Sequence, residues 1–200
     1  WVQRGIDIDG EASSDYSGTS VSLSSDGSIV AIGADYNDGN GSNSGHVRVY
    51  EWNGSAWVQR GIDIDGEASF DYSGTSVSLS SDGSIVAIGA GNNDGNGSNS
   101  GHVRVYEWNG STWLQKGSNI DGEASGDKSG LSVSISSDGS IVAIGARYND
   151  GNGSNSGHVR VYEWNGSAWV QRGIDIDGES SSDYSGTSVS LSSDGSIVAI

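Results

Sequence analysis

Short stretches of alternating hydrophobic and polar residues recur along the chain, separated by turns rich in Gly, Asp and Asn. Residues 20–24 read S-V-S-L-S, the alternation of a half-buried strand, and residues 46–52 alternate in the same way. Residues 28–34 are instead a continuous run of small, mostly apolar residues, which suits a strand buried on both faces. Residues 56–61 complete a predicted set of four strands, and no segment has helical periodicity.

Two tight turns and two long connections join these strands. Ser25-Asp26-Gly27 and Asn53-Gly54 are hairpin signals, because Gly readily adopts the positive φ that such turns require. The long connections are residues 35–45 and 62–74. In an up-and-down sheet the tight turns lie at one end and the long connections at the other. The sequence therefore predicts one long-looped, acidic rim and one short rim.

The whole pattern repeats every 56 residues: WVQRG at residues 1–5 returns at 57–61 and 169–173, and WLQKG stands at 113–117. We therefore expect a single tandem-repeat region, 1–200, with repeats 1–56, 57–112 and 113–168 and a partial repeat 169–200. A lone four-stranded sheet leaves one face wet, so the copies must stack. Stacking around an axis gives an all-β propeller of four-stranded antiparallel blades, and an open or helical stack is the alternative.

The repeats are almost identical, and their few differences are informative. The first two differ only at Ser14/Phe70, Asp35/Gly91, Tyr36/Asn92 and Ala56/Thr112. The first three of these pairs fall on the predicted long-loop rim. Rim loops are where repeat proteins usually bind their partners.

Charge narrows the choice of partner. The chain has 26 acidic and 9 basic residues, a formal net charge of −17. Phosphate binding needs a basic surface, so the sequence predicts no nucleic-acid partner, and no run of residues is long and apolar enough for membrane insertion. Cations and basic or neutral surfaces are the partners that this charge favours. With no Met and no signal sequence, the chain is expected to be a segment of a longer protein.

An ordered set of short motifs runs through each repeat: Asp15-Tyr16-Ser17-Gly18, then Ile32-Gly33-Ala34, then the strand Gly45 to Tyr50. This set resembles the FG-GAP repeat family, the unit of integrin-α-type propellers. The resemblance implies a seven-bladed propeller, of which this chain supplies about three and a half blades. It also implies an extracellular setting and adhesion or ligand-binding roles. The family's calcium loop between the first two strands is missing here, so that site is not carried over.

Calcium is nevertheless a candidate cofactor, because Asp and Asn oxygens on Gly-bearing loops are the ligands that it prefers. The candidate metal ligands are Asp7, Asp9, Asp15, Asp63, Asp65, Asp71, Asp175, Asp177 and Asp183. Their spacing is not that of an EF-hand, and Asn119 replaces the first Asp of the third repeat loop. In the alternative interpretation these residues form turns and keep the surface soluble.

The remaining chemistry is sparse. His46, His102 and His158 are one position copied three times, which we interpret as a structural histidine. The tryptophan pairs, such as Trp52 with Trp57, are expected to pack between blades. No catalytic motif is present, and identical copies argue against one asymmetric active site. The sequence thus predicts a non-enzymatic extracellular adhesion or binding module with a protein or glycan ligand. The alternative is a structural repeat that self-associates through open blade edges into a fibre, sheath or ring.

Overall fold

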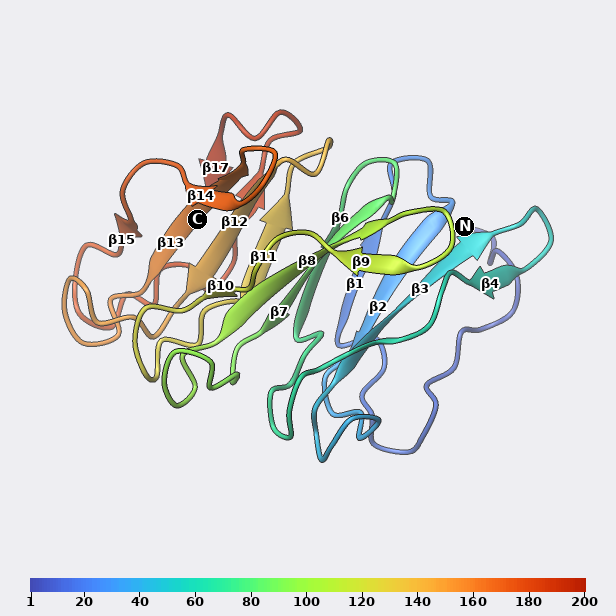
Figure 1. The fold of residues 1–200 in the computed structure, drawn as a ribbon, viewed down its shortest axis with the longest axis horizontal. Helices are drawn as coiled ribbons and strands as arrows, with labels where there is room; N and C mark the ends of the chain where they lie inside the picture. Colours follow the sequence, from blue (N-terminus) through green and yellow to red (C-terminus); the bar gives the residue numbers. More distant parts are fainter.

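The computed structural model describes residues 1–200 and contains three five-stranded antiparallel sheets and a two-stranded remnant (Figure 1). The first sheet comprises β1 (Ser20–Leu23), β2 (Ile29–Ala34), β3 (His46–Trp52), β4 (Trp57–Gln59) and β5 (Ile64–Asp65). The second comprises β6 (Ser76–Leu79), β7 (Ile85–Ala90), β8 (His102–Trp108), β9 (Trp113–Gln115) and β10 (Ile120–Asp121). The third comprises β11 (Ser132–Ile135), β12 (Ile141–Ala146), β13 (His158–Trp164), β14 (Trp169–Gln171) and β15 (Ile176–Asp177), and the remnant pairs β16 (Ser190–Leu191) with β17 (Val198–Ala199). No helix in the structure is long and apolar enough to cross a membrane.

Each sheet has one strand more than the sequence predicted. β3 pairs with β2 along one edge, and both β4 and β5 pair along its other edge. The predicted fourth strand is therefore shorter than residues 56–61 and resumes as β5 within the predicted loop 62–74. Gly61, with φ +87°, lies in the break between the two halves, and the buried Ile64 restores pairing opposite Val47. Residues 1–5 form no strand, because an outer strand pairs with the third strand of its own blade.

The tight turns form as their residue types predict. In the first hairpin, the Asp26 carboxylate accepts hydrogen bonds from the Ser28 amide at 2.9 Å and from the Ser24 hydroxyl at 2.8 Å, while Gly27 has a φ of +68°. These bonds hold the pKa of Asp26 down at about 2, because they favour the carboxylate. The short rim is thus built from turns that depend on ionised aspartates.

The sheets stack face to face, with the innermost strands β1, β6, β11 and β16 in contact with their neighbours from blade to blade. One apolar core joins the first and second sheets, and another joins the second and third sheets. The apolar runs of β2, β7 and β12 are buried along their whole length, as the sequence predicted. The chain is therefore a partial β-propeller, and each five-stranded sheet is one blade.

Hydrogen bonds between equivalent positions of successive repeats tie the blades together. Near the innermost strands, the amides of three turn serines donate to the serine carbonyl one repeat further on: Ser25 to Ser81 at 2.8 Å, Ser81 to Ser137 at 2.9 Å and Ser137 to Ser193 at 2.8 Å. On the outer side, Trp113 Nε1 donates to the Arg60 carbonyl at 2.8 Å, and its ring lies 5.4 Å from that of Trp108. The tryptophan pairs thus pack where successive repeats meet.

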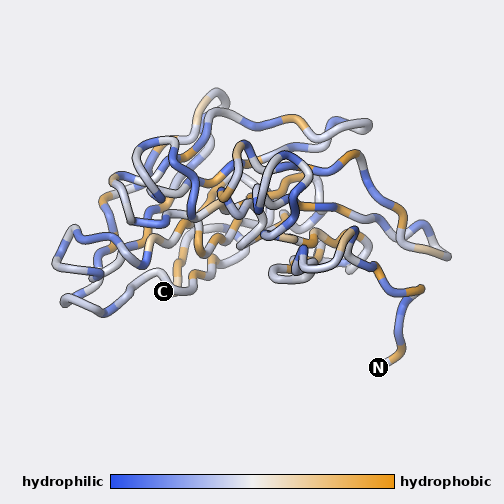
Figure 2. The backbone as a smooth tube through the Cα atoms, turned by 90° about the horizontal axis from the view of Figure 1, so that it is seen from below, coloured by the Kyte–Doolittle hydropathy of each residue, from blue (hydrophilic) through white to orange (hydrophobic).

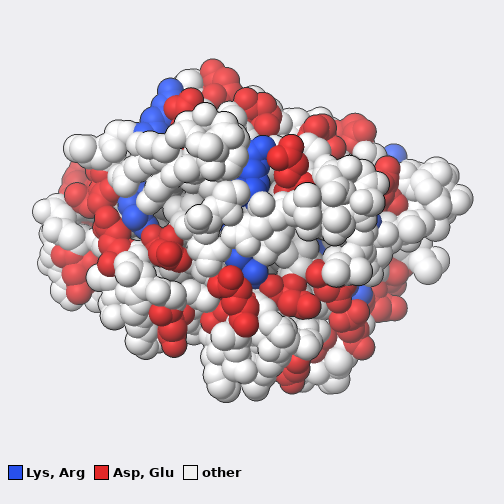
Figure 3. All heavy atoms as spheres, in the orientation of Figure 1, with Lys and Arg blue, Asp and Glu red and all other residues white.

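The two rims differ as the topology predicted. In Figure 1 the hairpins between the first two strands of each blade point upward, and the long connections hang along the lower side. Seen from that lower side in Figure 2, the loops are mainly hydrophilic, and the hydrophobic residues concentrate in the strands behind them. We call the lower side the long-loop rim, formed by residues 35–45 and 62–74 and their copies. On the face shown in Figure 3, acidic side chains are more abundant than basic ones and lie along both its upper and lower parts.

Candidate functional site

The long-loop rim is held by hydrogen bonds between side chains of successive loops. Asn37 Nδ2 donates to Asp15 Oδ2 at 2.9 Å, and Asn37 Oδ1 accepts the Gly39 amide at 2.7 Å. Asn40 Nδ2 then reaches the Gly66 carbonyl of the next loop at 2.8 Å. The same bonds recur in the second and third repeats. The rim is therefore a preorganised surface.

The predicted metal ligands fall into several environments. Asp15 and Asp71 are buried within turns, where each carboxylate accepts a backbone amide and an asparagine side chain, and Asp183 accepts the Ser180 amide. Asp7 accepts Gln3 Nε2, whereas Asp9 contributes its carbonyl to Arg48.

Turn formation accounts for these contacts. No three of the nine aspartates have their oxygens gathered within 4.8 Å of one another, and the calcium prediction stays a prediction.

Asp63 and Asp175 do join other potential ligands. We call the first group, Glu11, His46 and Asp63, the first junction cluster, because Glu11 precedes blade one while His46 lies on β3. His46 Nδ1 lies 3.8 Å from Glu11 Oε2 and 3.7 Å from Asp63 Oδ2. All three potential ligand atoms lie within 4.8 Å of one another. The topology thus brings together residues separated by 35 and 17 positions in the chain.

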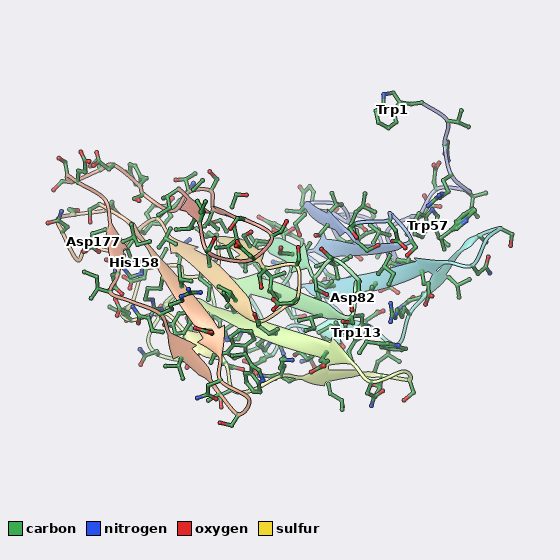
Figure 4. The ribbon with its side chains drawn as sticks, turned by 90° about the horizontal axis from the view of Figure 1, so that it is seen from above. Trp1, Trp57, Asp82, Trp113, His158 and Asp177 are labelled. Atoms are coloured by element: carbon green, nitrogen blue, oxygen red, sulfur yellow. The ribbon has the colours of Figure 1, made fainter.

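A third junction cluster repeats this arrangement 112 residues later with Glu123, His158 and Asp175. His158 Nδ1 lies 3.8 Å from a carboxylate oxygen of each acidic residue. Asp177, opposite His158 on the neighbouring strand β15, brings a further carboxylate oxygen to 4.0 Å (Figure 4). The predicted aspartates 175 and 177 therefore both face this histidine.

Burial favours the neutral form of the histidines in these clusters. Each is almost fully buried, and that burial lowers the pKa of His46 and of His158 below the usual value, although the carboxylates oppose the shift. Their contacts with the carboxylates are therefore not ion pairs at neutral pH. With its proton on Nε2, a neutral imidazole presents the Nδ1 lone pair beside two carboxylates, where positive charge would be stabilised.

A second junction cluster has the same plan with one change: Glu67 and His102 are joined by Asn119 in place of an aspartate. Asn119 Nδ2 lies 3.2 Å from Glu67 Oε2 and 3.4 Å from His102 Nδ1. Burial of the ring lowers the pKa of His102 to about 4. The amide hydrogens of Asn119 thus occupy the position between histidine and carboxylate.

Exposed aromatic residues mark one part of the long-loop rim. The rings of Tyr16 and Tyr36 lie 4.8 Å apart, and those of Tyr36 and Tyr72 lie 5.0 Å apart, both edge to face. We call these three residues the tyrosine ladder. Tyr16 is 61% exposed, Tyr36 40%, and the nearby loop residue Phe70 54%. Gly91 and Asn92 replace the corresponding part of the second repeat, which therefore lacks a ladder. The third repeat keeps one such pair, Tyr148 and Tyr184, whose rings lie 5.8 Å apart, also edge to face.

Hollows elsewhere are shallow. One of about 460 Å³ lies beside the remnant and is lined in part by Ile176, Tyr184 and Ile200. It adjoins Asp177 but none of the three histidines.

Sequence reasoning missed the junction clusters because their members come from different repeats. Glu11 and His46 carry no local signature, and the histidine has no metal-ligand spacing to another histidine. The available signal was Asn119, which replaces the Asp found at this position in the other repeats and lies beside His102 in the structure. Only the pairing of β3 with the segment after β4 shows that proximity.

Known proteins were then compared with this sequence and fold. A family model described as FG-GAP repeat matches residues 6–50, 62–106 and 120–162. No curated protein matches the sequence. Among solved structures, hydrazine synthase from Kuenenia stuttgartiensis is similar with a TM-score of 0.55 and 16% identity over 99% of this chain and 44% of that one. A Bacteroides uniformis protein given the provisional name 6-phosphogluconolactonase has a TM-score of 0.59 and 10% identity over 90% of this chain and 45% of that one.

These structural likenesses concern the fold alone. The chain spans less than half the length of either solved structure, and the identities are low. The family match covers all three complete repeats and agrees with the blades seen in the structure.

Proposed function

This chain belongs to the FG-GAP repeat family, and from that premise we propose that it is a non-catalytic binding module of a larger cell-surface or secreted protein. Its ligand, a protein or a glycan, would lie on the long-loop rim. The observation that carries the proposal is the exposed tyrosine ladder with Phe70, on a rim that is otherwise polar and acidic. Near-identical repeats differ at this surface: the second repeat has Gly91 and Asn92 there, and the third has only the pair Tyr148 and Tyr184. The three-membered ladder with Phe70 is thus a feature of the first blade and its boundary with the second.

The chemistry of the ladder supports a binding role. Aromatic side chains present a large contact area at low cost in conformational entropy, and they are enriched among the residues that dominate binding energy. Edge-to-face packing and the loop hydrogen bonds around Asn37 and Asn40 preorganise this surface. The net charge of −17 favours a neutral or basic partner.

The test is binding to a glycan array and to a panel of immobilised cell-surface ectodomains. Tyr36→Ala and Phe70→Ser should each weaken the strongest interaction by at least about tenfold, since a central aromatic contact is worth roughly 1–2 kcal/mol or more. Asn92→Ala, at the position of Tyr36 in the next repeat, is the matched control and should leave binding unchanged. Equal binding by all variants would exclude the tyrosine ladder as the recognition surface.

A second candidate function, structural assembly, is favoured by the open face of the first blade. Val21 and Leu23 are 64% and 59% exposed, whereas their copies Val77 and Leu79 are buried against the first blade. The occupant that fits this face is a further blade of the same repeat, because that is what covers it between the first and second blades. Light scattering tests this: a mass that rises with protein concentration and falls with Leu23→Lys supports assembly, and an unchanged monomer mass excludes it for this chain.

A further inference from the structure

We propose that the first and third junction clusters each bind one divalent transition-metal ion of the Zn²⁺ type, held by one imidazole nitrogen and two carboxylate oxygens. The residues are Glu11, His46 and Asp63 in one site and Glu123, His158 and Asp175 in the other. This inference does not depend on the ligand proposed for the long-loop rim.

The distances suit such an ion. Ligands about 2.0–2.2 Å from a tetrahedral zinc ion lie about 3.4 Å from one another. The separations between Nδ1 and the carboxylate oxygens are 3.7 and 3.8 Å in the first cluster and 3.8 Å in the third. The nitrogen-to-oxygen separations therefore need to contract by only a few tenths of an ångström, and the two carboxylate oxygens, which lie within 4.8 Å of each other, can approach through rotation of the exposed Glu11 and Glu123 side chains.

The buried histidine is the second, independent observation. His46 and His158 are each 1% exposed, and neither Nδ1 nor Nε2 of either ring has a hydrogen-bond partner. A buried polar nitrogen without a partner carries a desolvation cost, and native structures rarely leave one unexplained. At 3.7–3.8 Å an Nδ1–H would lie too far from the carboxylates to donate a hydrogen bond, whereas a cation between them would engage the nitrogen lone pair and both carboxylates.

In the second junction cluster a side-chain amide of the protein takes the place of one carboxylate. Asn119 places its Nδ2 within hydrogen-bonding distance of Glu67 and of His102 Nδ1, and His102 Nδ1 is accordingly not among the unpartnered atoms. One aspartate-to-asparagine difference thus gives this cluster a hydrogen-bond donor of its own. The chain therefore contains two candidate metal sites, the first and third junction clusters, and one natural control, the second junction cluster.

The donor set selects the class of metal. Imidazole nitrogen suits zinc and its transition-metal neighbours, whereas calcium takes six to eight oxygen ligands. The carboxylates are 26–45% exposed, so water can complete the coordination sphere. With Nδ1 as the ligand, the proton resides on Nε2, which has no acceptor. We expect affinity roughly 10- to 100-fold below that of sites whose histidine has such a partner.

Metal binding would also join consecutive repeats. Glu11 and Glu123 precede the blades that carry the histidines, and Arg48 and Arg160 lie 3.9 and 3.7 Å from the second oxygen of these glutamates. These arginines are fixed by bonds to the Asp9 and Asp121 carbonyls. The glutamates are therefore oriented from the side away from the ion.

Titration of the metal-free chain with Co²⁺, followed by its visible absorption, and with Zn²⁺ in competition tests the proposal by counting sites. We expect two ions per chain. His158→Gln should reduce the count to one, His46→Gln with His158→Gln to none, and His102→Gln should leave two. Asn119→Asp should raise the count to three, because it supplies the missing carboxylate beside His102.

Circular dichroism verifies the fold of each variant. The double variant Glu11→Gln with Glu123→Gln changes only exposed positions and should also abolish metal binding, so it provides the test if the histidine variants do not fold. The proposal is overturned if the chain binds no Co²⁺ or Zn²⁺ at millimolar concentration. It is equally overturned if the count is unchanged in the double histidine or double glutamate variant. Displacement of Zn²⁺ by an equal concentration of Ca²⁺ would also contradict it.

Discussion

Gly61 offers a sharp test of how one repeat packs on the next. Its φ is +87°, and a Cβ added there would lie 2.8 Å from Trp108 Cζ3 and 3.1 Å from Trp113 Cδ1, which flank the β8–β9 turn of the second blade. Gly173 occupies the same position in its repeat with a φ of +85°, yet nothing lies within 4 Å of its added Cβ. The two glycines thus share their backbone conformation and differ in the tryptophan contact.

The magnitude follows from this comparison. Placing Ala at positive φ costs about 1–2 kcal/mol at either position and cancels between them. Forcing a methyl group into the packed tryptophan pair costs about 1–3 kcal/mol more. For a protein of this size, that difference corresponds to a Tm lower by about 2–12 °C for Gly61→Ala than for Gly173→Ala.

Thermal unfolding followed by circular dichroism measures the difference. Gly117→Ala should behave like Gly61→Ala, because its added Cβ would lie 2.7 Å from Trp164 and 3.0 Å from Trp169. Equal destabilisation by Gly61→Ala and Gly173→Ala would refute the reasoning, since the tryptophan contact would then contribute nothing.

Three further predictions follow from the structure. Leu79→Ala should destabilise the chain by about 2–5 kcal/mol in urea unfolding, because Leu79 is buried between blades. Leu23→Ala, at the same position of the first repeat but 59% exposed, should cost under about 0.5 kcal/mol. Similar values for the two variants would contradict the stacking of these two sheets. The folded-state pKa of Asp26 and Asp194 is about 2, against an ordinary 3.8. Their contribution to stability is therefore complete above pH 3.8 and is lost as the pH falls toward 2, so the Tm should drop through that window. Replacing all four turn aspartates with Asn should flatten the drop; these are Asp26, Asp82, Asp138 and Asp194. Trp113→Phe removes the donor to the Arg60 carbonyl and should cost about 1–3 kcal/mol in the same urea assay, with Trp1→Phe, whose ring is fully exposed, as the silent control.

Sequence patterns predicted most of the fold because its determinants are local. Alternation located β1 and β3, the apolar run located β2, and Asp-Gly and Asn-Gly located the tight turns. The sequence did not predict β5, because a strand of two residues is too short to show an alternating pattern. Its pairing with β3 depends on the path of the chain after Gly61.

The candidate sites were less predictable than the fold. Aspartates at turn positions look like calcium ligands in sequence, yet Asp15 and Asp71 are buried and each accepts hydrogen bonds from an amide of its own loop and from an asparagine of a neighbouring loop. His46 looked structural because its carboxylate neighbours belong to other segments, one of them in the preceding blade connection. Contacts made across repeats cannot be seen from any one repeat.

The central claim, that these repeats stack as blades of one propeller, is tested most directly by amide hydrogen exchange measured by NMR at one repeated position. The amides of Ser25, Ser81 and Ser137 lie outside the strands and are bonded only to the next repeat, whereas the amide of Ser193 donates no backbone hydrogen bond. We predict slow exchange at the first three serines and fast exchange at Ser193. Fast exchange at all four would contradict the stacked-blade architecture.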